Sequence, residues 1–213
     1  MAPTDRFKPR RKPSQQRSVQ TRRWILAAAA HVFAEHGYGA GTTNRIAERA
    51  GVSIGSLYQY FPNKDSILSA LMDEHLERGT SVLTERLAPG LPGELDDVLR
   101  LFVAATIDTH RADPKLHQVL FEEAPRSPTL LARLHETEQF VVEMVTYLLT
   151  DHPQVSVPDT RLAARIVVAT VESLVHRLIA TADPVDPDEL EREIVELLGG
   201  YLRSAGRPTP EIS

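Results

Sequence analysis

The stretch GVSIGSLYQYF, residues 51–61, decides how the N-terminal part of this chain is expected to fold. It predicts a short helix, about Ile54 to Tyr60, that follows a glycine turn and ends before Pro62. A helix this short gains little stability from propensity alone, and Gly55 near its start lowers that propensity further. The polar and aromatic side chains of this helix therefore indicate contact with a partner outside the chain.

The residues before this helix favour a helix-turn-helix, with a preceding helix over about residues 43–50. Two short helices that cross steeply need a small residue at the crossing, a residue that tolerates positive φ in the turn, and an apolar residue that closes the core. Ala47, Gly51 and Leu57 meet these demands. The pattern Ala-x3-Gly-x5-Leu also fits many other helical hairpins, so it does not by itself identify a DNA-binding unit.

Composition excludes several classes of protein. The 213 residues are 42% hydrophobic and 25% charged, which is ordinary for a globular protein. The absence of cysteine excludes disulfides and thiolate metal sites, and no apolar run approaches the roughly 18 residues of a membrane span. No apolar segment precedes Trp24, so we expect no signal peptide and a cytoplasmic protein without a membrane partner.

Charge is distributed unevenly along the chain. Residues 1–64 hold 11 Lys/Arg and 3 Asp/Glu, a balance of +8, whereas residues 65–213 hold 13 Lys/Arg and 26 Asp/Glu, a balance of −13. This asymmetry is typical of a basic end that binds a polyanion, joined to an acidic body. A basic solubilising tail on an acidic domain would give the same distribution.

The whole chain is predicted to be all-α, with about nine helices. The expected parts are a disordered basic arm over residues 1–17, a helix-turn-helix domain over 18–64, and a larger helical body over 65–213. We expect Gly37 to end the first helix as a left-handed C-cap. Apolar residues recur at helical spacing over residues 18–36, 43–50, 54–60, 64–87, 92–111, 113–123, 126–151, 159–182 and 187–205.

Two segments closely resemble the N-terminal domain of the tetracycline-repressor (TetR) family of transcription regulators. They are AAHVFAEHGY, residues 29–38, and TTNRIAERAGVSIGSLYQYFPNKDSILSAL, residues 42–71. The resemblance implies homodimers that bind inverted-repeat operators on double-stranded DNA, usually repressing transcription until a small molecule binds the helical body. The residues that match the family's spacings are Phe33, Gly37, Thr43, Ile46, Ala47, Ala50, Gly51, Val52, Ser53, Leu57, Tyr58, Phe61, Lys64 and Leu68.

The residue types indicate how this unit would contact DNA. Ser56 and Gln59 can hydrogen-bond base edges in a major groove, and the hydroxyls of Tyr58 and Tyr60 can reach phosphates. Lys64 opposes the dipole of the helix that it begins. Taken alone this fits a solvated surface lysine, but beside a helix-turn-helix it favours contact with a phosphate. The resemblance implies backbone contacts by Thr43, Ser53, Tyr58, Tyr60 and Lys64, and base contacts by Asn44, Ile54, Gly55, Ser56 and Gln59.

Other features of the unit bear on the same interface. Thr42 and Thr43 can each cap the second helix, whose first backbone amides can hold an anion. Arg22 and the neighbouring Arg23 are better placed for defined contacts with DNA than the basic residues of the arm. The sequence GYGAGTT, residues 37–43, departs from the family's pattern, because its glycines predict a looser and more mobile loop.

The C-terminal body is expected to hold a ligand pocket and a dimer interface. Aromatic and polar side chains on apolar helices are typical of ligand sites, although ordinary cores have the same chemistry. Two apolar C-terminal helices fit either a four-helix seam with a symmetry mate or burial within one subunit, and the resemblance to the family favours the seam. Glu172 and His176 share a helix face and can bond each other, a ligand or water. The expected pocket residues are Phe102, Thr106, His110, Phe121, Phe140, Met144, Tyr147, Thr170 and His176, and the expected interface residues are Leu162, Ile166, Val167, Leu174, Leu178, Ile194, Leu198 and Tyr201.

No metal site, cofactor or catalytic centre is expected. His110, His117, Glu122 and Glu123 lie close in sequence, but they form no HExxH motif and His117 and Glu122 are not an i,i+4 pair. The sequence also lacks a nucleophile elbow, a phosphate-binding glycine loop and paired catalytic carboxylates, so an enzyme is not expected. The prediction is a sequence-specific DNA-binding repressor that a small-molecule effector releases from a palindromic operator. An activator and a ligand-independent DNA-binding protein of the same fold are the alternatives.

Overall fold

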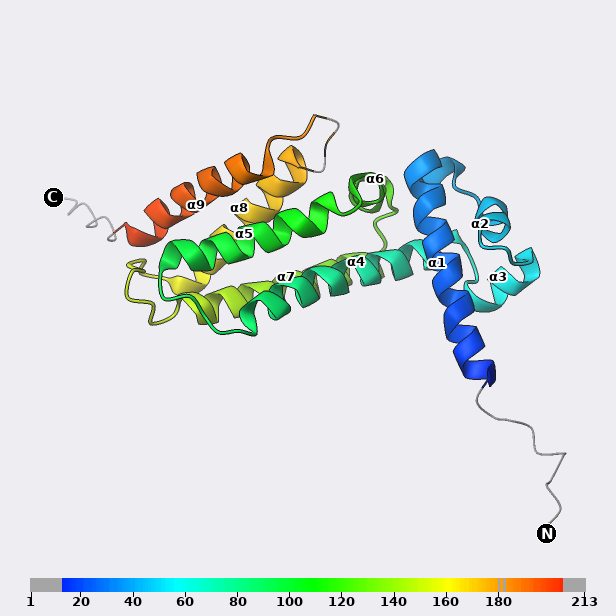
Figure 1. Ribbon diagram of the computed structural model, residues 1–213, viewed down its shortest axis with the longest axis horizontal. Coiled ribbons are helices and arrows are strands. Elements are labelled where there is room, and N and C mark those ends of the chain that lie inside the picture. The colour runs from blue at the N-terminus through cyan, green and yellow to red at the C-terminus, as the bar shows by residue number, and fades with distance from the viewer. Residues whose placement is uncertain (1–12, 180, 182, 205–213) are drawn as a thin grey trace, which may run out of the picture. The chain divides into compact units, whose positions relative to one another are not determined.

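The computed structural model describes residues 13–179, 181 and 183–204, and in this part of the chain it contains helices and no strand (Figure 1). The expected all-α fold with nine α-helices is confirmed for these residues. The helices are α1 (Pro13–Ala40), α2 (Thr43–Arg49), α3 (Ile54–Tyr60), α4 (Lys64–Leu87), α5 (Leu95–Arg111), α6 (Pro114–Gln118), the π-helix η1 (Val119–Glu123), α7 (Pro128–Leu149), α8 (Thr160–Leu178) and α9 (Pro187–Arg203).

The chain forms two compact units, which divide between Leu71 and Met72 within α4. The predicted boundary lies after residue 64, where α4 begins. The first turns of α4 belong to the first unit instead, since Ile67 and Leu68 are buried and lie before the division. One continuous helix therefore contributes residues to both units.

Helix α1 begins at Pro13, inside the stretch predicted to be a disordered arm, so the expected start near residue 18 is wrong. Proline is tolerated in the first turn of a helix, because its φ is already helical and no hydrogen bond is lost there. Residues 1–12 of the predicted arm lie outside the described residues. At the other end of α1, Gly37 has φ 71°, which interrupts the helix as expected for a glycine stop before the chain turns on to Ala40.

The connection between α1 and α2 is tightly packed where the glycines predict looseness. Gly41 is buried, and a Cβ at this position would lie 2.4 Å from Cδ1 of Phe33 and 2.8 Å from the carbonyl oxygen of Gly37. The backbone N–H of Gly41 donates to that oxygen over 3.1 Å. The close approach to α1 therefore explains why residue 41 is a glycine. A Cβ on Gly39, in contrast, would meet nothing within 4 Å.

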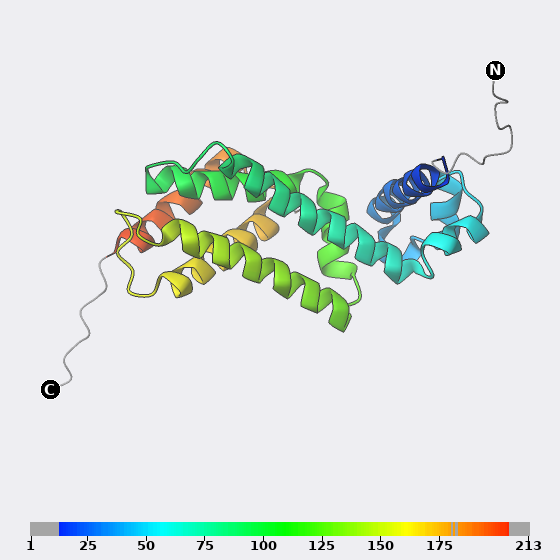
Figure 2. The ribbon, with the colours of Figure 1, turned by 90° about the horizontal axis from the view of Figure 1, so that it is seen from below.

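The second unit is a bundle of helices around one apolar core. Helix α8 packs against α5, α7 and α9, and α5 also packs along α9 (Figures 1 and 2). Val103, Val167 and Val171 are completely buried in this core. Burying a valine side chain contributes roughly 1.5–3 kcal/mol, so these positions hold the bundle together. Within the described part of the chain, no helix combines the length and the apolar character needed to cross a bilayer.

Three residues expected at a dimer interface lie in this core instead. Val167, Ile194 and Leu198 are at most 2% exposed within one subunit, so their assignment to the interface is wrong. Helices α8 and α9 bury one face against the rest of the bundle, and that face holds these three side chains. Leu162 and Ile166 remain 50% and 37% exposed, which leaves them available to a partner. The other three residues expected at the interface are half-buried against the core: Leu174, Leu178 and Tyr201.

We expect the substitution Gly41→Ala to destabilise the first unit by about 1–3 kcal/mol, because the new methyl group forces Phe33 or the Gly37 carbonyl to move. The matched substitution Gly39→Ala adds the same methyl group to open space and should not lower stability. Urea unfolding checks both variants, followed by circular dichroism and by the fluorescence of Trp24, the only tryptophan. Equal stabilities would contradict the packing assigned to Gly41.

Candidate functional site

A tight turn at Gly51 joins α2 to α3. Gly51 has φ 67°, a conformation that favours glycine, and the backbone N–H of Val52 donates to the carbonyl of Ala47 over 3.0 Å. Leu57 of α3 and Ile46 of α2 are fully buried. The small, flexible and apolar residues that the sequence predicts for a helix-turn-helix therefore occupy the crossing, the turn and the core.

The starts of α2 and α3 are held by side-chain caps. Oγ1 of Thr42 accepts a hydrogen bond from the backbone N–H of Arg45 over 3.3 Å. Oγ of Ser53 accepts one from the backbone N–H of Ser56 over 3.1 Å. A capping hydroxyl typically stabilises a helix by about 1 kcal/mol, which matters for helices of 7 residues. Both hydroxyls are thus used to position the helices.

The outer side of α3 is open to solvent. Ile54 and Tyr58 are 38% and 49% exposed, and Gly55 and Gln59 are also exposed. A Cβ on Gly55 would meet only Oγ of Ser53, at 4.0 Å, so packing within the chain does not require a glycine here. Alanine would favour the helix by up to about 1 kcal/mol. A partner whose surface comes close to the backbone of α3 would account for the glycine.

Two hydroxyls meet beside this face. The hydroxyl of Tyr58 lies 3.2 Å from Oγ1 of Thr43, so the pair links α3 to the start of α2. Either hydroxyl can donate to a third group, such as a phosphate oxygen, while it keeps the contact with the other. Asn44 is exposed on the next position of α2, whereas Ser56 and Tyr60 are half-buried.

Lys64 has a partner that its position in sequence does not reveal. Its Nζ donates to the carbonyl of Tyr38 over 2.6 Å and to that of Gly39 over 3.3 Å, and it stands 4.0 Å from the centroid of the Tyr38 ring. Asp65 accepts a hydrogen bond from the Tyr38 hydroxyl, and burial together with this carboxylate raises the pKa of Tyr38. The carbonyls at the end of α1 thus offset the unfavourable helix dipole at Lys64.

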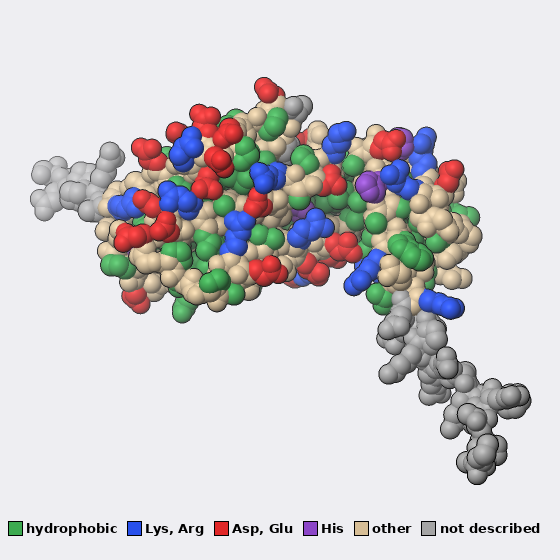
Figure 3. All heavy atoms as spheres, viewed as in Figure 1, with side chains coloured by type: hydrophobic (Ala, Val, Ile, Leu, Met, Phe, Trp, Pro, Cys, Tyr) green, Lys and Arg blue, Asp and Glu red, His purple; other side chains and the backbone are tan. Residues whose placement is uncertain are grey.

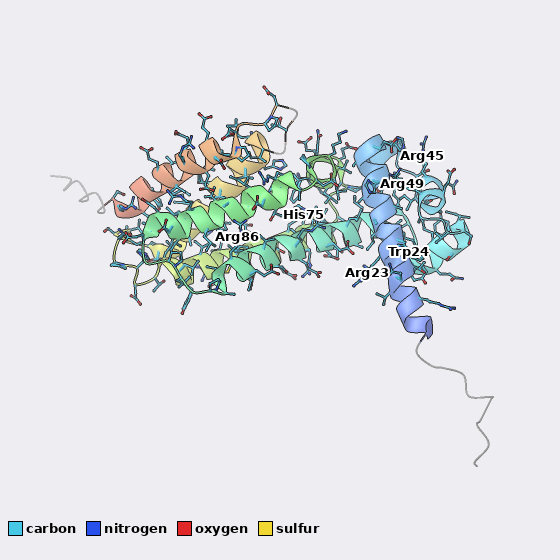
Figure 4. All side chains as sticks on the ribbon, in the orientation of Figure 1. Arg23, Trp24, Arg45, Arg49, His75 and Arg86 are labelled. Carbon is cyan, nitrogen blue, oxygen red and sulfur yellow. The ribbon has the colours of Figure 1, made fainter. Side chains whose placement is uncertain are left out.

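Basic side chains surround the helix-turn-helix on α1 and α2 (Figure 4). The guanidinium of Arg22 lies 5.5 Å from the centroid of the Phe61 ring, which anchors it on the first unit. Arg45 and Arg49 are exposed on α2, and sequence reasoning did not select either of them. Their helical positions alone could have suggested them, since an exposed arginine beside a recognition helix is a common phosphate ligand.

The second unit contains a cavity of about 200 Å³ among α4, α5, α7, η1 and α8. Apolar side chains make most of its wall, including Leu83, Phe102 and Val168. His75, which Figure 4 labels on α4, lies at the polar part of the wall with His110. An apolar cavity with a few polar groups is the usual form of a site for a small organic ligand.

The cavity includes some of the predicted pocket residues and excludes others. Phe102, Thr106, His110 and Phe121 line it. Phe140 and Tyr147 do not, because they lie on the outer side of α7 and are 53% and 76% exposed, so their assignment to the cavity is wrong. Met144 packs on the core, and Thr170 and His176 are half-buried outside the lining. Lining residues of α4 that the sequence did not suggest are His75, Leu76, Gly79, Thr80 and Leu83.

Histidines from four helices meet at this polar part of the wall. Nε2 of His117 lies 2.7 Å from Nδ1 of His176, and Nδ1 of His110 donates to the carbonyl of Thr106 over 2.8 Å. Burial lowers the pKa of His110, against the opposing hydrogen bond to Thr106. Burial together with neighbouring histidines lowers the pKa values of His117 and His176, and lowers the pKa of His75 to about 4. These rings are therefore neutral at pH 7.

Glu172 is the acidic group of the cavity wall. Its Oε2 lies 3.5 Å from Nε2 of His110 on α5, and it also interacts electrostatically with His176 on its own helix. The side chain lines the cavity with half of its surface accessible, and desolvation raises its pKa to about 7. The cavity thus presents a carboxyl that gains or loses its proton near neutral pH.

Three histidines form a group that could hold a metal ion, although the sequence predicts no metal site. His110, His117 and His176 each offer a ring nitrogen, and these atoms lie within 4.8 Å of one another. His110 and His117 lie close together along the chain, whereas His176 comes from the distant α8. Long-range packing therefore assembles a group that sequence spacing does not reveal.

Exposed apolar side chains interrupt the charged surface of the second unit. Figure 3 shows acidic and basic side chains interspersed over it, with hydrophobic ones between them. Leu162 and Ile166 on α8 and Leu197 on α9, the last 58% exposed, are not covered within the subunit. These three residues are available for contact with another copy of the chain.

Comparison with known proteins gives two family matches. Residues 25–71 match the family described as "Bacterial regulatory proteins, tetR family", and residues 94–202 match the one described as "Tetracyclin repressor-like, C-terminal domain". The chain is also similar to the fatty acid metabolism regulator protein of Bacillus subtilis. The two are 26% identical over 82% of this chain and 91% of that protein.

Two solved structures have a similar fold over both units. The fatty acid degradation regulator FadR from Bacillus halodurans is 28% identical, with a TM-score of 0.71 over 86% of this chain and 96% of that one. The regulator FadR from Bacillus subtilis, solved in complex with stearoyl-CoA, is 25% identical. Its TM-score is 0.69 over 83% of this chain and 96% of that one.

We expect Lys64→Met to lower the free energy of unfolding of the first unit by about 1–2 kcal/mol, because it removes charge-assisted hydrogen bonds to Tyr38 and Gly39. The same change at Lys115, which is exposed on α6, serves as the control and should be nearly neutral. Urea unfolding followed by Trp24 fluorescence measures the loss. A neutral Lys64→Met would instead support a solvated lysine.

Proposed function

We propose that this chain, which belongs to the TetR family of bacterial regulatory proteins, represses transcription as a homodimer until an acyl-chain effector enters the cavity of its second unit. As a member of that family it is a DNA-binding transcription regulator. The observation that carries the proposal is the division of α3 into a buried Leu57 and an exposed outer side. That outer side offers polar groups and an open glycine where a helix would meet the edges of base pairs.

The contacts with DNA follow from the exposed groups of the first unit. Gln59 can read a base edge in the major groove, and Gly55 lets the backbone of α3 approach the duplex. The paired hydroxyls of Thr43 and Tyr58, with the guanidinium of Arg45, suit phosphate oxygens on either side of the groove. Lys64 donates two hydrogen bonds to the end of α1, and the third N–H of its ammonium group is left for a phosphate.

A homodimer would present two recognition helices to an inverted repeat. The exposed Leu162 and Ile166 of α8 and Leu197 of α9 supply the apolar part of the interface. Isologous contacts of this kind are the commonest basis of symmetric dimers. With one α3 per subunit, the operator would contain two half-sites about 34–36 Å apart between centres.

The lining of the cavity and the names of the relatives both support an effector with an acyl chain. The wall of the cavity is mainly apolar, which suits a hydrocarbon chain, and at its polar part His75 and the protonated form of Glu172 can donate a hydrogen bond to a carbonyl. The similar protein of Bacillus subtilis is named a fatty acid metabolism regulator, and the related FadR structure holds stearoyl-CoA. An acyl-coenzyme A or a related fatty-acyl compound is therefore the proposed ligand class.

The signal would pass through α4. Its first residues belong to the DNA-binding unit, and Leu76, Gly79 and Thr80 further along it line the cavity. A ligand that binds one arrangement of α4 better than another shifts the population of DNA-binding dimers by that difference in affinity. The proposal contains no catalytic step, and it places the protein in the bacterial cytoplasm, where the DNA is.

Selection of bound sequences from a pool of randomised duplexes tests the DNA-binding part. An inverted repeat should emerge, and its binding should weaken steeply as salt rises. Gly55→Ala should leave the first unit as stable as before, or more so by up to about 1 kcal/mol, while it weakens operator binding. If the variant binds the selected operator as tightly as the original chain, α3 does not approach DNA through Gly55.

Titration of the protein–operator complex with medium-chain and long-chain acyl-coenzyme A, and with coenzyme A alone, tests the effector. The acyl compounds should release the DNA and coenzyme A should not. Ala105→Phe, which fills the cavity from α5, should keep DNA binding and abolish release, whereas Ala132→Phe on the exposed side of α7 should change neither. Tighter DNA binding on addition of acyl compounds would identify an activator or a corepressed regulator.

A further inference from the structure

Four of the chain's eight histidines gather around one point of the second unit. They come from four elements: His75 from α4, His110 from α5, His117 from α6 and His176 from α8. The ring centroid of His117 lies 4.3 Å from that of His110, 4.9 Å from that of His176 and 5.1 Å from that of His75. The two outer rings, of His110 and His176, are 6.5 Å apart.

The cluster offers lone pairs at neutral pH. His110 is 5% exposed and His117 is 1% exposed, and their burial lowers both pKa values, so the rings are neutral. Nδ1 of His110 carries its proton, because the Thr106 carbonyl 2.8 Å away can only accept. Nε2 of His110 therefore keeps a free lone pair. A ring that donates one N–H to a backbone carbonyl is the usual arrangement of a metal-ligating histidine.

The two ring nitrogens of His117 are not fully hydrogen-bonded by the described residues. Nε2 faces Nδ1 of His176 over 2.7 Å, where two lone pairs would repel, so one of these rings must hold a proton between them. Nδ1 of His117 is buried and has no hydrogen-bond partner among the described residues. Burying a nitrogen without a hydrogen-bond partner has a cost in stability. The packing of His117 on Phe121, with ring centroids 4.3 Å apart, explains the position of its ring but not this cost.

We propose that His110, His117 and His176 bind a divalent transition-metal ion, with Zn²⁺ as the best fit. Zinc in proteins takes nitrogen ligands at about 2.0–2.1 Å in tetrahedral geometry, which puts ligand nitrogens about 3.3 Å apart and ring centroids about 5.2 Å apart. The three nitrogens lie within 4.8 Å of one another, and the centroid distances of 4.3, 4.9 and 6.5 Å bracket the required value. Small side-chain rotations would complete the site.

The surroundings suit a cation with an open coordination position. Glu172, whose Oε2 is 3.5 Å from Nε2 of His110, supplies a nearby carboxylate that offsets the charge or becomes the fourth ligand. His110 and Glu172 also line the cavity, whereas His117 and His176 do not, so the ion would stand at the cavity wall. Three neutral imidazoles with an available fourth position favour Zn²⁺, Ni²⁺ or Cu²⁺ over the harder Mg²⁺ and Ca²⁺. The inference concerns ion binding and does not depend on DNA binding or on the effector.

The test uses the full-length protein after removal of metals with a chelator. Calorimetry with Zn²⁺ should give one ion per chain, and Co²⁺ should give the intense visible absorption of a four-coordinate site. His176→Gln removes a half-buried ligand and should weaken Zn²⁺ binding at least about 100-fold. The control is His135→Gln, which changes a histidine on the exposed part of α7 and should bind Zn²⁺ as the original chain does.

The readouts distinguish loss of the site from loss of the fold. Circular dichroism should report the same helix content for both variants, and the melting temperature of the original chain should rise with Zn²⁺ while that of His176→Gln should not. If His176→Gln is as well folded as the control and still binds Zn²⁺ with unchanged affinity, the proposal is wrong. It is also wrong if the original chain binds no Zn²⁺, or if Co²⁺ shows only the weak absorption of a hydrated ion.

Discussion

The positive φ of Gly51 is the constraint on which the DNA-binding unit depends. At 67° this angle reverses the chain within two residues, so that the N–H of Val52 reaches the carbonyl of Ala47 and α3 can lay Leu57 into the core. A residue with a side chain would resist this angle. Because Leu57 occupies the inner side of α3, the opposite side is left to Gly55, Tyr58 and Gln59, and recognition depends on that division.

The sequence predicted the first unit well wherever the signals were local. Capping hydroxyls at Thr42 and Ser53, the glycine turn and the buried leucine are set by residues within a few positions of one another, and all are found as expected. For Lys64 the sequence did not reveal the partners within the chain, because the carbonyls of Tyr38 and Gly39 lie 25 or more positions away. Spacing along the chain shows that a charge conflicts with its helix, but it does not show which distant group resolves the conflict.

The second unit shows the limit of periodicity more clearly. Helical spacing correctly placed α8 and α9, but it does not distinguish a face that packs within the subunit from one that meets a partner, and Val167 and Ile194 proved to be core residues. The cavity and the histidine cluster depend on how α4, α5, α6 and α8 come together. His117 and His176 are 59 positions apart, so no motif in the sequence could join them.

The size of the cavity has a consequence for pharmacology. At about 200 Å³ it is smaller than the roughly 300–1,000 Å³ of typical sites for organic ligands, so the proposed ligand with a long acyl chain would fit only after the helices spread. That spreading lowers the apparent affinity, since only the opened fraction of the protein is competent to bind. A compact molecule that fills the closed cavity needs no such rearrangement. It would compete with the effector for the cavity without releasing the protein from its operator.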